Sequence, residues 1–124
     1  MYFLSTLLST SKYYSRLYDV GGWLTVLETR DEWYCIKHWV ENEFSPVFQR
    51  FAIALRTDLI HPGQYLWNYP DGSTTYPVYE EWALSRPQDS PCVSMMIGSG
   101  VDHQGQWMDV ECYDDRVWAI CEKM

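Results

Sequence analysis

The sequence predicts an α+β fold in which two helices precede a run of strands. Helix-like spacing of apolar residues is confined to the first 46 residues, after one short strand candidate, whereas the segments beyond residue 50 resemble strands. The length of 124 residues fits one domain, spanning residues 1–124. A composition that is 47% hydrophobic and 17% aromatic supplies enough apolar surface for a dense core.

The first helix is predicted from its start and stop signals. After the apolar strand candidate at residues 1–5, the hydroxyl groups of Ser9, Thr10 and Ser11 offer N-caps. The Gly21-Gly22 pair ends the helix that follows. Its apolar side would consist of Tyr13, Tyr14, Leu17 and Tyr18.

A second helix follows the apolar segment at residues 23–27. Thr29 and Glu32 form a capping box, in which the Thr29 hydroxyl caps the helix and the Glu32 side chain reaches back. Residues 42–46 end the helix. The face at helical spacing that we expect to be buried consists of Trp33, Ile36 and Val40.

Two strand-like segments flank a polar loop near the C-terminus. Residues 92–97 alternate and then become continuously apolar, and residues 117–121 are apolar except at their ends. We expect the loop between them, which includes residues 105–112, to bury Trp107. A bridge from Cys92 to Cys112 would anchor this loop and stabilise the fold by about 3 kcal/mol. The four cysteines by themselves allow three fully paired connectivities.

The charge balance excludes several classes of partner. Nine basic and seventeen acidic side chains give a formal net charge of −8. Phosphate binding needs clustered lysine and arginine, and anionic membranes repel acidic surfaces. Since no apolar run approaches membrane-spanning length either, we expect no nucleic-acid partner and no membrane span.

No motif for catalysis or for a cofactor stands out. The seventeen acidic residues supply no distinctive carboxylate pair for glycoside hydrolysis, and no nucleophile-elbow pattern surrounds a serine. The three histidines, His38, His61 and His103, are not at metal-ligand spacing. The sequence therefore offers no motif that predicts catalysis, and we expect no cofactor.

The spacing of several residues resembles that of C-type lectin-like domains. Cys92-Val93, Trp107 with Asp109 and Cys112, and Ile120-Cys121-Glu122 match three successive family motifs. Gly21-Gly22 and the Thr29-x-x-Glu32 box fall at matching intervals in the N-terminal half. The resemblance covers essentially the whole chain. It implies a C-type lectin-like fold with two helices, antiparallel sheets and a loop-rich ligand-binding subdomain.

The same resemblance implies further strands in the middle of the chain. Residues 51–55 are similar to the family's Phe-Trp-Ile-Gly-Leu strand, and His61-Pro62-Gly63 is a turn. Residues 64–67 and 71–73 resemble the family's Trp-x-Asp-Gly hairpin. Trp82 matches the tryptophan that opens the family's ligand-binding loop.

Sugar-binding members of this family hold calcium with a Glu-Pro-Asn or Gln-Pro-Asp tripeptide and neighbouring carboxylates. The tripeptide position here is Arg86-Pro87-Gln88, and a guanidinium repels a cation. Met108 stands where the family has asparagine, so Asp109 is the one unambiguous ligand that remains. We therefore expect no metal at this position, while Pro87 resembles the family's cis proline.

The same edge of the domain is the candidate ligand-binding site. By position it would be lined by Trp82, Arg86, Pro87, Gln88, Asp89 and Asp109. Arginine beside an aromatic ring suits an acidic sugar, a sulfate or a protein carboxylate. In a plainer alternative, Trp82 and Trp107 are core residues and Arg86 pairs with a neighbouring acid.

The resemblance implies non-enzymatic recognition with two candidate functions, and an enzyme on this scaffold is a third alternative. The first is a lectin-like module that binds carbohydrate without calcium. The second is a protein-ligand module, in which the sugar site has decayed and loop aromatics such as Tyr69 and Tyr79 contact a partner. The expected partner is accordingly a glycan or an extracellular protein.

Cys35 and Cys121 stand outside the expected bridge. The family's helix-end cysteine would fall at position 17, where this chain has Leu17, so the usual partner of Cys121 is missing. The two thiols could pair with each other, stay buried and unbonded, or leave Cys35 to link two chains. A disulfide favours an extracellular or secreted location, although residues 1–8 lack the length and basic start of a signal peptide.

Overall fold

The computed structural model describes residues 2–6, 22–43, 49–98, 104–112 and 117–123, and these contain one helix and eight strands. The helix is α2 (Arg30–Glu43). The strands are β1 (Tyr2–Thr6), β2 (Gly22–Leu24), β3 (Gln49–Thr57), β4 (Tyr65–Asn68), β5 (Thr74–Thr75), β6 (Cys92–Ile97), β7 (Gln106–Val110) and β8 (Val117–Lys123). The α+β class is confirmed. The first predicted helix lies outside the described residues.

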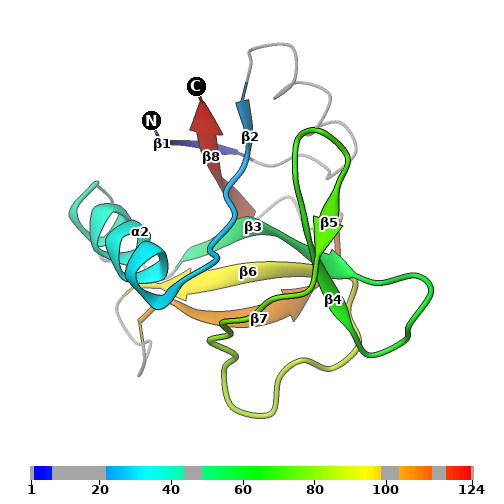
Figure 1. Cartoon of the computed structure of the whole chain (residues 1–124). Helices are drawn as coiled ribbons and strands as arrows, with labels where there is room; N and C mark the ends of the chain where they lie inside the picture. The colour runs from blue at the N-terminus through cyan, green and yellow to red at the C-terminus, as the bar shows by residue number, and fades with distance from the viewer. Residues whose placement is uncertain (1, 7–21, 44–48, 99–103, 113–116, 124) are drawn as a thin grey trace.

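The strands form a branched sheet centred on β3 and β8 (Figure 1). β3 pairs antiparallel with β6 over residues 49–53 and, past a register shift, at Arg56, and it pairs antiparallel with β4 along its last three residues. The sheet continues from β6 to β7 and from β4 to β5. β8 pairs antiparallel with both β1 and β2, so the two ends of the described chain lie side by side.

One pairing departs from the predicted antiparallel arrangement. β3 and β8 run parallel, with Phe51 opposite Trp118 and Ala52 opposite Ala119. β3 therefore has neighbours on both edges, and residues 51–55 are all buried. A strand covered on both faces has a continuous apolar sequence, which does not reveal the direction of its neighbours.

Two strands lie where the sequence predicts other structure. β2 occupies the start of the apolar segment that was expected only to lead into the second helix, and β7 runs through the predicted loop at residues 105–112. In β7, Trp107 and Asp109 are buried, while Met108 between them is half-buried. Because one inward position carries an aspartate, the hydrophobic alternation typical of a strand is hidden.

The predicted capping box begins α2. The backbone N–H of Glu32 donates to the Thr29 hydroxyl at 3.1 Å, and this hydroxyl lies 3.5 Å from the Glu32 carboxylate. The predicted apolar face is also confirmed, since Trp33, Ile36 and Val40 are the buried residues of the helix.

Gly105 fixes α2 against the start of β7. The indole N–H of Trp33 donates to the Gly105 carbonyl at 2.7 Å. Gly105 has φ +85°, and a Cβ atom there would lie 2.9 Å from the Lys37 side chain. Only glycine accommodates both this conformation and this close approach.

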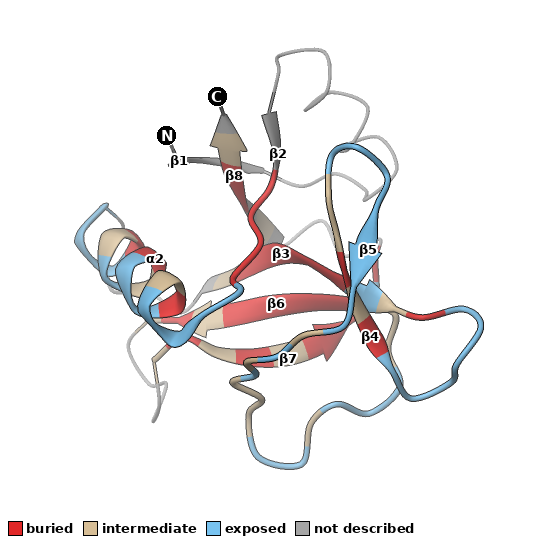
Figure 2. Cartoon of the chain, in the orientation of Figure 1, coloured by how far each residue is buried: buried red, intermediate tan, exposed pale blue. Residues whose placement is uncertain are grey.

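Figure 2 shows the buried residues concentrated along β3, β6 and β7, whereas the loops beside β4 and β5 are exposed. Trp107 lies at the centre of an aromatic cluster and is completely buried. The rings of Trp67, Tyr79 and Trp82 meet it edge-on, with centroid distances of 5.5, 6.0 and 5.8 Å. Trp107 is therefore a core residue, as the plainer alternative predicts, and the half-buried Trp82 packs against it.

Asp58 organises the loop between β3 and β4. Its carboxylate accepts hydrogen bonds from the Tyr76 hydroxyl at 2.7 Å and the Ile60 backbone N–H at 3.0 Å, and it lies 2.8 Å from His61 Nδ1. These contacts, the Tyr76 hydroxyl above all, lower the pKa of Asp58 to about 2. The loop is thereby held in place although Leu59 and Ile60 are almost fully exposed.

Replacing Asp58 with asparagine is expected to reduce the acid sensitivity of the fold. A carboxylate whose pKa falls on folding contributes stability that is complete above its ordinary pKa of about 3.9 and is lost at lower pH. The melting temperature of the unmodified chain should therefore fall more steeply toward pH 2 than that of the Asp58→Asn chain. Tyr76→Phe should act in the same direction. Equal slopes for all three chains would contradict this role of Asp58.

Candidate ligand-binding loop

Residues 84–90, between β5 and β6, form a loop that we call the cis-proline loop. On one side of it, the Ala83 backbone N–H donates to the Trp107 carbonyl at 2.8 Å, and the Trp107 N–H donates to the Glu81 carbonyl at 2.6 Å. On the other side, the Thr57 N–H donates to the Pro91 carbonyl at 3.0 Å. Both ends of the loop are therefore bonded to strands of the sheet.

The backbone of this loop has a defined shape. The peptide bond between Arg86 and Pro87 is cis, as the sequence resemblance implies. Ser85 and Asp89 each have φ +66°, in the left-handed region, on either side of this bond. The Arg86 N–H also donates to the Ala83 carbonyl at 3.0 Å and closes the first turn of the loop.

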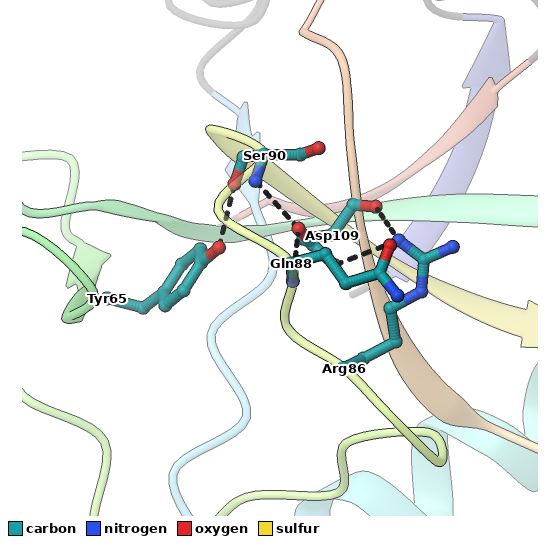
Figure 3. Close-up of polar contacts among 5 residues, drawn as sticks. All are labelled: Tyr65, Arg86, Gln88, Ser90 and Asp109. Carbon is teal, nitrogen blue, oxygen red and sulfur yellow. Dashed lines mark hydrogen bonds and ion pairs between the residues drawn. The ribbon is translucent and has the colours of Figure 1, made fainter.

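Asp109, which projects from β7, forms hydrogen bonds with Arg86, Gln88 and Ser90 of the cis-proline loop (Figure 3). One carboxylate oxygen accepts hydrogen bonds from the backbone N–H groups of Gln88 and Ser90, at 2.8 and 2.7 Å. The other accepts a hydrogen bond from Arg86 Nη1 at 3.2 Å. The Asp109 side chain is 0% exposed, so both of its oxygens serve protein donors inside the fold.

The electrostatics of the site favour a charged Asp109. Burial by itself raises the pKa of this carboxyl, but hydrogen bonds from Ser90, Gln88 and Arg86 outweigh burial and leave the pKa below its ordinary value. Tyr65 reinforces the arrangement, since its hydroxyl donates to the Ser90 carbonyl at 2.8 Å. Burial, followed by the negative charges of Asp109 and Asp89, raises the pKa of Tyr65 to about 12, so this hydroxyl stays protonated.

The structure divides the predicted site residues by exposure. Pro87, Gln88 and Asp89 are exposed at the tip of the cis-proline loop, and the Arg86 side chain is 28% exposed. Asp109 lies beneath them. The plainer alternative, in which Arg86 pairs with a neighbouring acid, is therefore confirmed. That these residues bind a ligand stays a prediction.

Trp82 has a different environment from the tip of the loop. Its ring is tilted against Tyr65 at a centroid distance of 5.1 Å and meets Trp107 edge-on. Trp82 is half-buried and packs against the hydrophobic core. It supports the loop from the side of the sheet.

Two further residues shape the site without a sequence signal. Ser90 contributes a backbone N–H and a backbone carbonyl, which no side-chain pattern reveals. Tyr65 comes from β4, far from the cis-proline loop in sequence. Tyrosine in a strand is common enough that its position alone indicates no role.

No group of three histidine, cysteine, aspartate or glutamate side chains that could hold a metal ion occurs in the described parts of the chain. The groups that surround Asp109 are N–H donors, and a cation needs oxygen or other lone-pair ligands. The hydrogen bonds to Asp109 therefore anchor the cis-proline loop to β7.

Cys92 and Cys112 form a disulfide bond with a Cα–Cα distance of 5.2 Å. The bond joins the start of β6 to the residues just after β7, beside the cis-proline loop. Cys35 is exposed on α2, whereas Cys121 is fully buried in β8. The alternative in which Cys35 and Cys121 pair with each other is therefore wrong.

Replacing both Cys92 and Cys112 with serine is expected to lower the free energy of unfolding by about 3 kcal/mol. The reason is the greater freedom of the unfolded chain, since the bond closes a loop with a sequence separation of 20. Urea unfolding of the double variant measures the effect. Cys35→Ser, a change of the exposed thiol, is the control and should stay within about 0.5 kcal/mol of the unmodified chain. An equally small loss in the double variant would contradict the prediction.

The helix in the described residues is neither long nor apolar enough to cross a membrane. No protein-family model matches the chain, and no curated protein matches it. Solved structures do match. Human lithostathine has a TM-score of 0.74 and 21% sequence identity, over 97% of this chain and 80% of that one.

Two C-type lectins are also similar to this chain in structure. The mouse scavenger receptor C-type lectin carbohydrate-recognition domain has a TM-score of 0.69 and 20% identity, over 98% of this chain and 87% of that one. The Ca2+-independent C-type lectin SPL-2 from Saxidomus purpuratus has a TM-score of 0.72 and 17% identity, over 97% of this chain and 83% of that one. The fold that presents the cis-proline loop is thus the C-type lectin-like fold.

Proposed function

We propose that this protein is a lectin-like recognition module that binds carbohydrate without calcium through the exposed face of the cis-proline loop. The observation that carries the proposal is the position of Asp109, whose two carboxylate oxygens accept hydrogen bonds from protein donors. Calcium takes six to eight oxygen ligands, and here the one acidic residue left from the family's set points at N–H groups. The similarity to a calcium-independent lectin supports the proposal.

The exposed groups of the loop suit an acidic glycan. Arg86 uses Nη1 for Asp109, and its guanidinium has other N–H donors for a carboxylate or sulfate. Gln88 binds Asp109 through its backbone alone, so its side-chain amide is available to donate to and accept from sugar hydroxyls. Because Asp109 already fixes the backbone, a ligand would not have to order the loop on binding.

The proposal is tested by binding to immobilised sulfated and uronate-containing glycans in the presence of a calcium chelator. Gln88→Ala removes an exposed amide but keeps the backbone N–H that Asp109 needs, so the fold should persist while glycan binding weakens. Arg30→Ala, on α2, controls for loss of an exposed polar side chain elsewhere. Binding that requires calcium, or equal binding by both variants and the unmodified chain, would contradict the proposal.

A protein-ligand module is the second candidate function. The observation that favours it is the exposure of Leu84, a large apolar side chain of the cis-proline loop, at 94%. Tyr79, expected to contact a partner, instead packs edge-on against Trp107 and donates to Glu81 at 2.5 Å. Binding to a protein partner that free glycans do not compete would favour this candidate.

We infer an extracellular location and a purely binding role. The disulfide between Cys92 and Cys112 is typical of oxidising compartments. The similar solved structures named above include two lectins, which supports recognition in place of catalysis. Glycan or extracellular protein is accordingly the class of partner that we propose.

A further inference from the structure

A pocket of 230 Å³ is lined by residues from the segment that precedes α2, from the β4–β5 hairpin and from the segment just after β5. We call it the hairpin pocket. It is lined by Glu28, Trp67, Tyr69, Thr75, Tyr76 and Val78. None of these residues belongs to the cis-proline loop, so the pocket is separate from the site proposed above.

The lining of the hairpin pocket combines aromatic rings with one negative charge. Three of its residues are aromatic, and Glu28 is the one charged residue among the described residues that line it. Burial, together with the nearby carboxylates of Glu28 and Glu32, raises the pKa of Tyr69, although its contact with Thr75 acts in the opposite direction. The pocket therefore combines aromatic rings and oxygen acceptors with a negative charge, a combination that attracts cations.

Trp67 supplies a second, independent observation. It is 1% exposed, and its indole N–H has no acceptor within the described parts of the chain. A buried N–H donor without a partner is destabilising, so such groups in native structures call for an explanation. An amino sugar carries hydroxyl oxygens that accept from such a donor, whereas a lysine side chain offers its charge alone.

The volume limits the size of the ligand. Pockets for drug-sized molecules measure about 300–1,000 Å³, and the hairpin pocket is smaller. It fits a single charged head group. A primary ammonium has three N–H donors, for which the Glu28 carboxylate and the hydroxyl oxygens of Tyr69 and Thr75 are acceptors.

The geometry points to the hairpin pocket as a binding site for a primary ammonium group, carried by an amino sugar or by a lysine side chain. Both sources share the charge and the size that the pocket requires. A neutral sugar lacks the positive charge that both Glu28 and the aromatic rings favour.

The experiment follows the indole N–H resonance of Trp67 by NMR, with the resonance assigned by a Trp67→Phe variant. Glucosamine and n-butylamine are titrated as the two amines, and glucose and n-butanol as their uncharged counterparts. A saturable shift with an amine and none with its uncharged counterpart is expected. Saturation by glucosamine alone identifies an amino sugar, whereas saturation by n-butylamine identifies a lysine-like ammonium.

Variants test whether the pocket itself is responsible. Glu28→Gln should weaken amine binding about tenfold or more, since a hydrogen bond to a charged group is lost. Glu80→Gln, which removes an exposed carboxylate outside the lining, should leave amine binding unchanged. Absence of a saturable shift with both amines, equal shifts with glucose, or unchanged affinity in Glu28→Gln would each overturn the inference.

Discussion

Replacing Asp109 with alanine is expected to lower the free energy of unfolding by about 3–5 kcal/mol, the usual cost of removing one partner from a buried ion pair. The variant would leave the Arg86 guanidinium and the backbone N–H groups of Gln88 and Ser90 without their acceptor. For a domain of this size the melting temperature should fall by roughly 10 °C or more. Urea unfolding followed by circular dichroism measures the change.

The control for this prediction is Asp89→Asn, which changes an exposed carboxyl on the same loop and keeps a residue that tolerates φ +66°. It should stay within about 0.5 kcal/mol of the unmodified chain. A double-mutant cycle with Arg86→Ala should show a coupling energy of about 0.5–3 kcal/mol between the two side chains. A loss in Asp109→Ala as small as that in Asp89→Asn would show that Asp109 does not hold the loop.

The dependence of this effect on pH follows from the lowered pKa of Asp109. The stability contributed by a carboxylate of this kind is present above its unfolded pKa of about 3.9 and is lost as the pH falls through its folded pKa. The difference in stability between the unmodified chain and Asp109→Ala should therefore be largest near neutral pH and shrink in acid.

Replacing Trp107 with alanine is expected to cost about 3–5 kcal/mol, the range for removing a large aromatic side chain from a core. Trp107 is completely buried, and the lost edge-on contacts with Trp67, Tyr79 and Trp82 add about 0.5–1.5 kcal/mol for each pair. The backbone of the same residue bonds to Glu81 and Ala83, so the cis-proline loop should also lose order.

Urea unfolding of Trp107→Ala is compared with that of Trp107→Phe, which keeps an aromatic ring and should lose less. Leu84→Ala is the control for removing a large apolar side chain, because Leu84 is 94% exposed. It should change the free energy of unfolding by no more than about 0.5 kcal/mol. The prediction fails if Trp107→Ala is no less stable than Leu84→Ala.

The parts of the fold that the sequence predicts correctly depend on neighbours along the chain. The capping box of Thr29 and Glu32 and the buried face of α2 follow from spacings of three and four residues. The cis bond before Pro87 follows from a resemblance that is itself a pattern of spaced residues. Such signals can be recognised without knowing the tertiary structure.

The parts that the sequence does not predict depend on contacts between distant segments. β7 is hidden because Asp109 occupies an inward position, and that position makes sense only once Gln88 and Ser90 lie above it. The parallel pairing of β3 with β8 leaves no pattern in either strand. The hairpin pocket, likewise, unites Glu28 with residues of the β4–β5 hairpin that lie about forty or more positions further along the chain.

We propose that the cis-proline loop recognises its ligand without calcium because Asp109 is bonded to protein donors. Thermal melting in millimolar calcium and in chelator tests this most directly, since a ligand that binds only the native state raises its stability, by about 2.7 kcal/mol at one hundred times its Kd. The melting temperature should be the same in both solutions. A clear rise in calcium that chelator reverses would contradict it and would mean that Asp109 exchanges its protein donors for a metal ion.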